Sequence, residues 1–302
     1  MSKMPSHHGV IENSQKEKTY PDETIKLLLE RASCRNFQDR EIPEEVLDYI
    51  LRAGVHTPSG GNLQPYSIIK IEDPDNRKRL GELCSQPFIG KAPVNLIFCI
   101  DWRRIKRWAD LEVAPFTAHC SFRHFWISFQ DTIIAAQNIC TAADAMGLGS
   151  VYIGTIIEFF PEVKEMFSLP DLVLPVVLLC IGYPVKRPGI RKKLPVNAIV
   201  HNEKYHEMKD DELLKVFTGK YLEKRVEISE KRLRKIEHVC KEVSGEEFAN
   251  KCIEKIKEQG YINPAQHYFG LHYMANEMPG GNEEYLKTIE KFGFNWFREY
   301  KL

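Results

Sequence analysis

The chain has 302 residues, of which 43% are hydrophobic, and its 42 basic residues balance its 42 acidic residues. This length and composition can bury a large core in one domain or two, and the balanced charge argues against a dedicated nucleic-acid-binding protein. The longest apolar run, residues 172–181, is shorter than the roughly 20 residues that cross a bilayer. We therefore expect neither nucleic acid nor a membrane as a partner.

The cysteines and the N-terminus indicate the compartment. The eight cysteines show no C-x-x-C spacing, and several lie in apolar runs, which favours buried, reduced thiols. Residues 1–20 are polar and lack the apolar segment of a signal peptide. We expect a cytoplasmic protein in which residues 1–20 form a flexible N-terminal tail. Its histidine pairs stand five positions apart instead of four, so no metal site is expected.

Helical and strand patterns alternate along the first two thirds of the chain. Asp22 or Thr24 can cap a first helix, and a second runs between Pro43 and Gly54. Runs rich in β-branched residues predict strands at residues 66–71, 94–100, 151–153 and 172–183, and a short charged helix fits residues 75–84. This alternation implies a sheet covered by helices on both faces.

Residues 121–146 predict a long helix that is apolar on most sides. Such a helix must be buried, either inside the core or against a second subunit.

After residue 203 the composition shifts to Lys and Glu with scattered Leu and Ile. The patterns predict helices over residues 229–243, from a capping box of Ser244 and Glu247 to Gly260, from Pro264, and from Asn282, followed by buried rings at positions 294, 296, 297 and 300. These helices have narrow apolar faces. We therefore expect residues 204–302 to pack against other parts of the protein instead of forming an independent core.

Two short stretches carry the chemistry. Residues 31–37 place Arg31, Ser33 and Arg35 close together, and arginine forks match phosphate oxygens. Taken alone, these residues also fit a solvated helix end. Within residues 57–66, the run Pro-Ser-Gly-Gly at 58–61 cannot be a helix or a central strand, and its two glycines allow backbone amides to approach a ligand. The amide side chains that follow suit the polar edge of a heterocycle. The residues of interest there are Pro58, Ser59, Gly60, Asn62 and Gln64.

The pattern R-x-S-x-R followed by P-S-G-G-N-x-Q-P resembles the FMN-dependent nitroreductase family, which also includes flavin reductases and iodotyrosine deiodinases. The resemblance continues at residues 135–138, 147–154 and 191–193. It implies an α+β fold with three α/β/α layers around a mixed sheet. It also implies an intertwined homodimer, with the long helix at the interface and a C-terminal strand crossing to the partner. The FMN-binding domain would span residues 21–203, and residues 204–302 would be a helical C-terminal extension. We expect this extension to wrap around the dimer and rim its site, with a docking surface for a redox partner protein as the alternative.

The resemblance also implies the cofactor site. Arg31, Ser33 and Arg35 would face the FMN phosphate, ribityl chain and pyrimidine edge, and the five residues of 58–64 would reach the flavin from the other subunit. The segment Ile153, Gly154 and Thr155 would pack beside the isoalloxazine, and Arg191 and Lys193 would be a second pair of phosphate-binding cations. In isolation, residues 191–193 also fit a solvated charge run, and residues 147–149 a simple helix end.

By the same resemblance, hydride passes from NADH or NADPH to FMN and then to a small planar acceptor, a nitroaromatic, quinone or flavin, in a ping-pong reaction. The cofactor carries this chemistry, so no catalytic side chain is expected. A flavin-binding protein with a regulatory or redox-partner-docking role is the alternative. Acceptor choice should depend on residues 101–129, whose aromatic rings could stack on an acceptor and whose basic run could meet a 2′-phosphate or an acidic substrate. Equally, those rings could pack under a loop and the charges could be solvated. The residues with which deiodinases grip an amino acid are not recognisable, which disfavours that activity.

Overall fold

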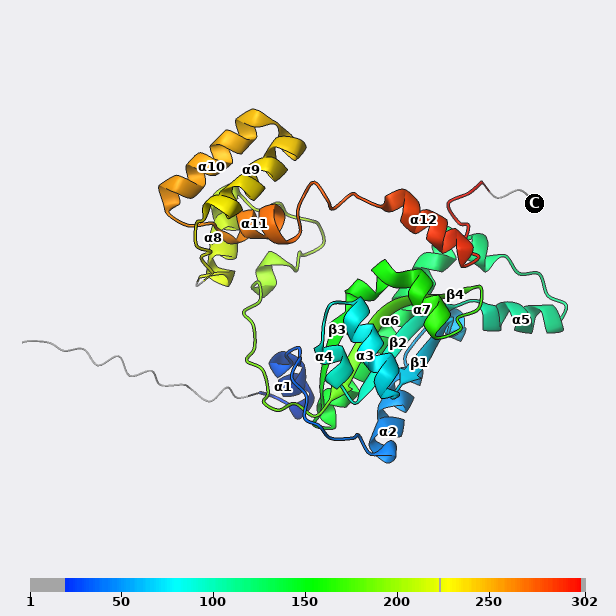
Figure 1. Ribbon diagram of the computed structural model, residues 1–302. Helices are drawn as coiled ribbons and strands as arrows, with labels where there is room; N and C mark the ends of the chain where they lie inside the picture. Colours follow the sequence, from blue (N-terminus) through cyan, green and yellow to red (C-terminus); the bar gives the residue numbers. More distant parts are fainter. Residues whose placement is uncertain (1–19, 223, 300–302) are drawn as a thin grey trace, which may run out of the picture.

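The computed structural model describes residues 20–222 and 224–299 (Figure 1). Of the predicted N-terminal tail only Tyr20 is described, and Tyr300 also lies outside the described residues. At the centre is a four-stranded sheet with the strand order β1-β2-β4-β3. Its strands are β1 (Tyr66–Ile71), β2 (Val94–Asp101), β3 (Gly149–Ile153) and β4 (Val173–Gly182). All four predicted strands are confirmed, with ends within two residues of those expected.

The direction of the strands differs from the prediction. All three pairings, β1 with β2, β2 with β4 and β3 with β4, are antiparallel, so the sheet is antiparallel and not mixed. Between β1 and β2 the chain leaves along α3 (Pro74–Leu83) and returns along α4 (Phe88–Lys91). It therefore re-enters the sheet at the end where β1 stopped, with Ile71 opposite Asn95. Helix–strand alternation in a sequence does not reveal that the chain doubles back in this way.

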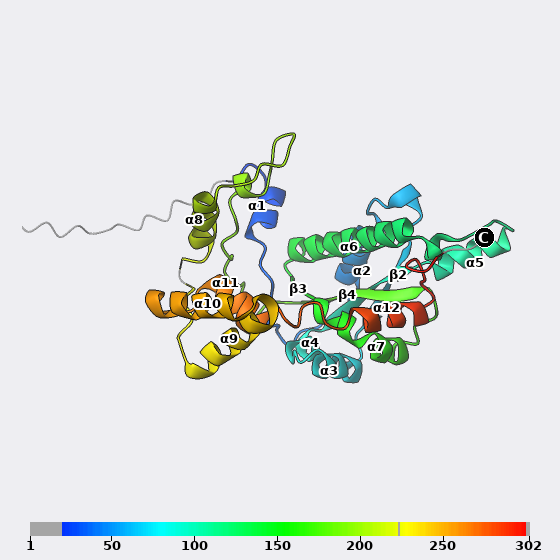
Figure 2. The ribbon, with the colours of Figure 1, turned by 90° about the horizontal axis from the view of Figure 1, so that it is seen from above.

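The three predicted layers are present (Figure 2). One face of the sheet is covered by α2 (Glu44–Val55) and α6 (Phe122–Ala145), and the other by α3, α4 and α7 (Phe160–Met166). The central strands β2 and β4 are buried at every position. Alternate side chains of β2 therefore enter two different cores, as Phe98 does on the α6 side and Ile97 on the α3 side. The α/β/α architecture follows from this two-sided burial.

Helix α6 is buried along one face only. Ala136, Ile139, Cys140 and Ala143 are fully covered. Four other large apolar side chains of α6, which we call its exposed stripe, are not covered in this way, namely Phe122, Trp126, Phe129 and Ile134. Of the two expectations for this helix, burial in the core accounts for the covered residues. The exposed rings are only partly covered within the described part of the chain, where Phe122 contacts Trp296 at a ring-centroid distance of 5.3 Å.

Smaller elements surround the sheet. Asp22 caps α1 (Glu23–Glu30) by accepting from the amides of Thr24 and Ile25. Helix α5 (Arg103–Leu111) projects beyond the end of β2 (Figure 2). Single 3-10 turns are η1 (Gly60–Asn62), η2 (Ala118–Cys120), η3 (Gly154–Phe159) and η4 (Val196–Ala198).

The helices after β4 fall into two groups. Gathered beside one end of the sheet are α8 (Asp210–Lys220), α9 (Glu230–Ser244), α10 (Glu246–Gln259) and α11 (Pro264–His267), the last continuing into a π-helical turn η5 (Tyr268–His272). Their buried centre is small and consists of Ile236, Ile256 and Ile262. By contrast, α12 (Asn282–Lys291) lies against α7, with the rings of Phe160 and Phe292 5.9 Å apart. The predicted extension is thus partly built into the main core.

Two details of this region test the sequence patterns. Gly260 ends α10 in the left-handed conformation, as predicted. The predicted capping box of Ser244 and Glu247 is wrong, because α9 continues through Ser244 and Gly245 takes the N-cap position of α10 without a side-chain cap.

The structure describes no strand in residues 183–222 or 224–299, so the strand expected to cross to a partner stays a prediction. Among the described helices, none combines the length and apolarity needed to cross a membrane.

The segment after α12 provides a test of its place in the core. Phe294 is fully buried and packs edge-on against Phe125 of α6, with ring centroids 5.8 Å apart, whereas Phe248 on α10 is 53% exposed. We expect Phe294→Ala to lower the free energy of unfolding by about 3–5 kcal/mol. The control, Phe248→Ala, should lower it by less than about 0.5 kcal/mol. Urea denaturation measures both, and equal losses would show that the C-terminal segment is not part of the main core.

Candidate functional site

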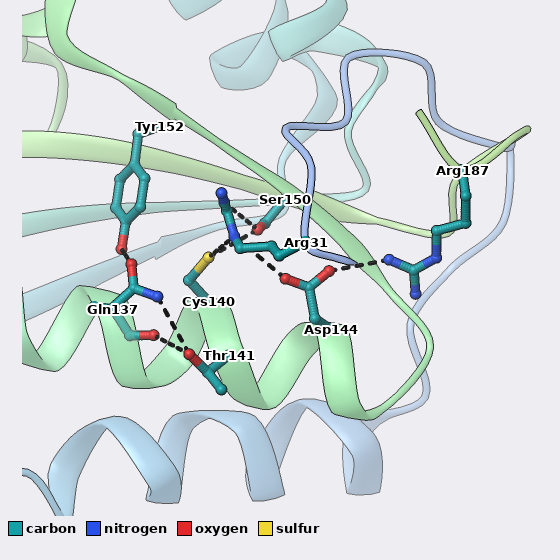
Figure 3. Close-up of polar contacts among 8 residues, drawn as sticks. All are labelled: Arg31, Gln137, Cys140, Thr141, Asp144, Ser150, Tyr152 and Arg187. Carbon is teal, nitrogen blue, oxygen red and sulfur yellow. Dashed lines mark hydrogen bonds and ion pairs between the residues drawn. The ribbon is translucent and has the colours of Figure 1, made fainter. Parts of the chain in front are cut away.

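Arg31 is held between α6 and β3 (Figure 3). Its Nε donates a hydrogen bond to Cys140 Sγ at 3.0 Å and lies 3.4 Å from Asp144 Oδ2, and its Nη2 donates to Ser150 Oγ at 3.3 Å. These contacts come from two separate elements and fix the direction of the guanidinium plane. Arg31 is therefore a fixed cation at the C-terminal end of α6.

Asp144 is the buried centre of this group, with a side chain only 4% exposed. A second guanidinium reaches it from the segment after β4, where Arg187 Nη1 donates to Oδ1 at 3.0 Å. Burial raises the pKa of Asp144, and the two arginines oppose that rise. Two cations around one carboxylate leave a local excess of one positive charge, which favours a bound anion.

The first motif lies beside the start of β3 and near α4. The amide of Cys34, next to Arg35, donates to the carbonyl of Ser150 at 2.9 Å, and the Arg35 guanidinium lies 6.0 Å from the centre of the Phe88 ring. Two residues before that ring, Gln86 Nε2 donates to Thr155 Oγ1 at 3.3 Å. The loop between α3 and α4 thus brings the first motif and residues 153–155 together, with Ser33 and Arg35 exposed.

Gly154 gives this group an open side. Ile153 before it is 2% exposed, so the backbone is anchored there, whereas Gly154 itself is exposed. A Cβ atom added at Gly154 would meet no atom of the chain within 4 Å. Packing within the protein therefore does not require a glycine here, and the space beside it suits the close approach of a planar ligand.

The second motif forms a constrained loop at another part of α6. Gly61, Asn62 and Gln64 have φ angles of 60°, 54° and 49°, and Asn is one of the few other residue types that tolerate this left-handed region. The Gly60 amide donates to both carboxylate oxygens of Asp131, at 3.2 and 3.0 Å. The carboxylate thus holds the loop in a conformation that costs free energy.

Gln64 forms its hydrogen bonds within the protein. Its backbone amide donates to Ser59 Oγ at 3.1 Å, and its side-chain nitrogen Nε2 donates to the carbonyl of Val55 at 2.8 Å and to the Tyr66 hydroxyl at 3.3 Å. Pro58 and Asn62 are exposed, so their side chains are the accessible ones. The structure therefore assigns Gln64 mainly to shaping the loop.

The two groups are separated in one chain. We call Arg31, Ser33, Arg35 and residues 153–155 the arginine half, and residues 58–64 the loop half. The arginine half lies at Asp144 and the loop half at Asp131, and 13 residues of α helix correspond to about 20 Å. Within a single chain the predicted residues therefore form two halves instead of one site.

Arg191 and Lys193 join neither half directly. Both are exposed, on a segment anchored nearby by Arg187. The pKa of Tyr268 is lowered chiefly by Lys224 and also by Arg191, so Arg191 lies toward the π-helical turn. Within the described residues, no group of three or more His, Cys, Asp or Glu side chains could hold a metal ion.

Sequence reasoning missed the residues that hold the two halves. Asp131 and Asp144 are the two acidic residues of α6, and each lies on the buried face of that helix. An isolated carboxylate in a mostly apolar helix was the available signal, because a buried charge needs a partner. The identity of that partner depends on the tertiary structure and cannot be read from the spacing of residues in the sequence.

Comparisons with known proteins show the family of the chain. The model of the nitroreductase family matches residues 28–183, just over half of the chain. The chain belongs to the nitroreductase family. The matched range contains the arginine half and the loop half and ends just after β4.

Relatives and solved structures extend the match. The chain is 32% identical over 190 residues to an FMN reductase (NADPH) of Bacillus subtilis, covering 62% of this chain and 76% of the relative. It is 34% identical over 192 residues to an oxygen-insensitive NADPH nitroreductase of Salmonella typhimurium, covering 63% and 78%. The structure of NfrA2 from B. megaterium superposes with a TM-score of 0.69 at 26% identity, covering 91% of this chain and 99% of the other. The structural likeness of this nitroreductase-family chain therefore continues into the C-terminal helices.

The Asp131 carboxylate yields a test of how the loop half is held. Asp131→Ala removes the acceptor of the Gly60 amide and should lower the free energy of unfolding by about 1–3 kcal/mol. Asp131→Asn keeps an acceptor and should retain the loop. Burial raises the pKa of Asp131, so the folded chain binds this proton more tightly than the unfolded chain. The wild type should therefore gain stability relative to Asp131→Asn as the pH falls from neutral through that raised pKa.

Urea denaturation of the wild type and Asp131→Asn, in parallel from neutral to mildly acidic pH, measures this difference. A stability difference that does not change with pH would contradict the role given to the buried carboxylate.

Proposed function

We propose that this member of the nitroreductase family is an FMN-dependent oxidoreductase. It takes hydride from NADH or NADPH and delivers it to a small planar acceptor such as a nitroaromatic, a quinone or a free flavin. The observation that carries the proposal is the arginine half, in which Arg31 is fixed between α6 and β3, Arg35 is exposed, and the exposed Gly154 follows the end of β3. The FMN reductase and the NADPH nitroreductase among its relatives support the same chemistry.

The residues of the chain fit FMN in separate roles. Arg31 supplies a fixed guanidinium for the phosphate, and Arg35 supplies an exposed cation for the polar edge of the ring system. Ser33 is exposed between them and offers a hydroxyl to the ribityl chain. When bound, FMN supplies the centre that accepts and donates hydride. The protein's part is to position the reactants and to tune the charge around them.

A second copy of the chain would complete the site. The exposed stripe of α6 carries four large apolar side chains, Phe122, Trp126, Phe129 and Ile134, each between 38% and 55% exposed. Burying such a stripe against a second copy removes apolar surface from water. In this homodimer the loop half of one chain joins the arginine half of its partner. Arg191 and Lys193 would add charge at the phosphate end.

A cavity beside the loop half suits the acceptor. It measures about 550 Å³ and includes Leu63, which follows Asn62 in the loop. Its walls include Trp102, Trp108 and Phe116, with the rings of Trp102 and Phe116 5.8 Å apart. Aromatic walls favour a planar, largely apolar molecule.

The proposal also covers organisation and compartment. Residues 21–203 form the FMN-binding domain, and residues 204–302 form the extension, whose α12 joins the main core. All eight cysteines are free thiols and five of them are buried, which fits a reducing compartment such as the cytoplasm.

A spectrum of the purified protein, followed by reduction, tests the activity. We expect flavin absorbance at a ratio of one FMN per chain, bleaching on addition of NADPH or NADH, and recovery on addition of a nitroaromatic or quinone. A protein that stays colourless with added FMN would refute the proposal. A flavin that binds but is not reduced by either nucleotide would favour a regulatory flavoprotein.

Complementation tests the shared site. Arg35→Glu damages the arginine half and Asn62→Asp the loop half, and we expect each homodimer to bind FMN at least about tenfold more weakly. A heterodimer of the two variants contains one intact site and one doubly damaged site, so it should hold about one FMN per two chains. Differently tagged chains, co-expressed and purified in tandem, give this ratio. If each chain built its own site, both sites of the heterodimer would be damaged and FMN would be lost.

A further inference from the structure

Arg104 makes an unusual set of contacts at the start of α5. Its Nη2 donates to the carbonyl oxygens of Gln64 and Tyr66, both at 2.8 Å. Its Nη1 donates to Ser67 Oγ at 3.1 Å. One guanidinium therefore holds the end of the loop half and the first residues of β1, using the planar fork that lysine lacks.

The guanidinium is itself held in place by Asp101, which is 6% exposed. Asp101 Oδ2 accepts from the Ser67 hydroxyl and lies 3.4 Å from Arg104 Nη1, while Oδ1 accepts from the Arg104 amide at 3.0 Å. The Asp101 amide in turn donates to the carbonyl of Pro65 at 2.8 Å. The end of β2, the start of α5 and the end of the loop are thus joined in one network.

The loop needs such a fixed point at this end. Asn62 and Gln64 both have positive φ angles, which non-glycine residues keep only where the surroundings determine the backbone. Asp131 fixes the Gly60 amide at the beginning of the loop, and Arg104 fixes the Gln64 carbonyl at its end. The conformation that presents Asn62 is therefore determined from both sides.

The same helix borders the acceptor cavity. Ile105 and Trp108 of α5 line that cavity together with Leu63 of the loop, while Arg104 holds the loop end. The geometry points to Arg104 as a positioning residue that fixes the flavin-binding loop and ties it to the wall of the acceptor cavity. This inference rests on the proposed function and adds a residue that touches neither cofactor nor acceptor.

The sequence also allows a different role for Arg104, in which the basic residues of α5 bind a 2′-phosphate or an acidic substrate. A substitution of Arg107 distinguishes this role from positioning of the loop. Arg107 lies on the same helix and carries the same charge, and no hydrogen bond or ion pair connects its side chain to the rest of the described chain. Loss of Arg107 removes a basic charge without removing a carbonyl contact.

The experiment compares Arg104→Ala, Arg104→Lys and Arg107→Ala in the full-length protein. The dissociation constant of FMN, the visible circular dichroism of bound flavin, and kcat and KM with each nucleotide are measured. We expect Arg104→Ala to weaken FMN binding by about tenfold, because hydrogen bonds from a charged donor are lost. We also expect a changed flavin dichroism and a larger effect on kcat than on either nucleotide KM.

The other two variants complete the prediction. Arg104→Lys keeps the charge and should fall between the wild type and Arg104→Ala, and it serves as the test if the alanine variant does not fold. Arg107→Ala should leave the FMN dissociation constant within about twofold of the wild type.

Three results would overturn the inference. They are equal FMN affinity for the wild type and Arg104→Ala, equal effects of Arg104→Ala and Arg107→Ala, and a rise in KM confined to NADPH, which would assign Arg104 to the 2′-phosphate. Failure of the wild type to bind FMN would instead overturn the proposed function, and this inference with it.

Discussion

The buried carboxylates of α6 are the constraint on which the site depends. A helix of 24 residues is stiff, and Asp131 and Asp144 project from its buried side at a fixed separation. One carboxylate binds the Gly60 amide of the loop half, and the other pairs with Arg31 of the arginine half. The burial of each charge is tolerable because a partner neutralises it or donates to it. The same helix that fills the core therefore spaces the two halves of the cofactor site.

This spacing explains why a dimer is part of the functional proposal. Two halves about 20 Å apart along one rigid helix do not enclose a common ligand within one chain. A second copy packed on the exposed stripe of α6 buries apolar surface and supplies the missing half at the same time. In the proposed dimer, one surface would link assembly to cofactor binding, so that cofactor affinity and subunit affinity would be thermodynamically coupled.

The fold was largely predictable from the sequence, because its signals are local. β-branched runs gave the four strands to within two residues, and Pro43 and Gly260 marked the start of α2 and the end of α10. Gly54 did not mark the end of α2, because the helix continues through this buried glycine to Val55. The strand directions were not predictable, since they depend on the way α3 and α4 return the chain to the sheet. The capping box at Ser244 failed for a related reason, because α9 runs one residue further than its pattern suggests.

The candidate site residues could be proposed from the sequence, but their geometry could not. Residue types and the family resemblance pointed to Arg31, Arg35 and the loop at 58–64. The partners that hold them, Asp131, Asp144 and Arg104, come from distant elements and carry no local signal. Gln64 illustrates the difference, because an amide that suits a heterocycle equally suits the backbone carbonyl it meets at 2.8 Å.

A crystal structure of the protein with FMN tests the central claim most directly. The account predicts one flavin at each of two equivalent sites, in contact with Arg35 of one chain and with Asn62 of the partner chain. A flavin whose contacts with both motifs come from the same chain, or one bound away from Gly154, would contradict it.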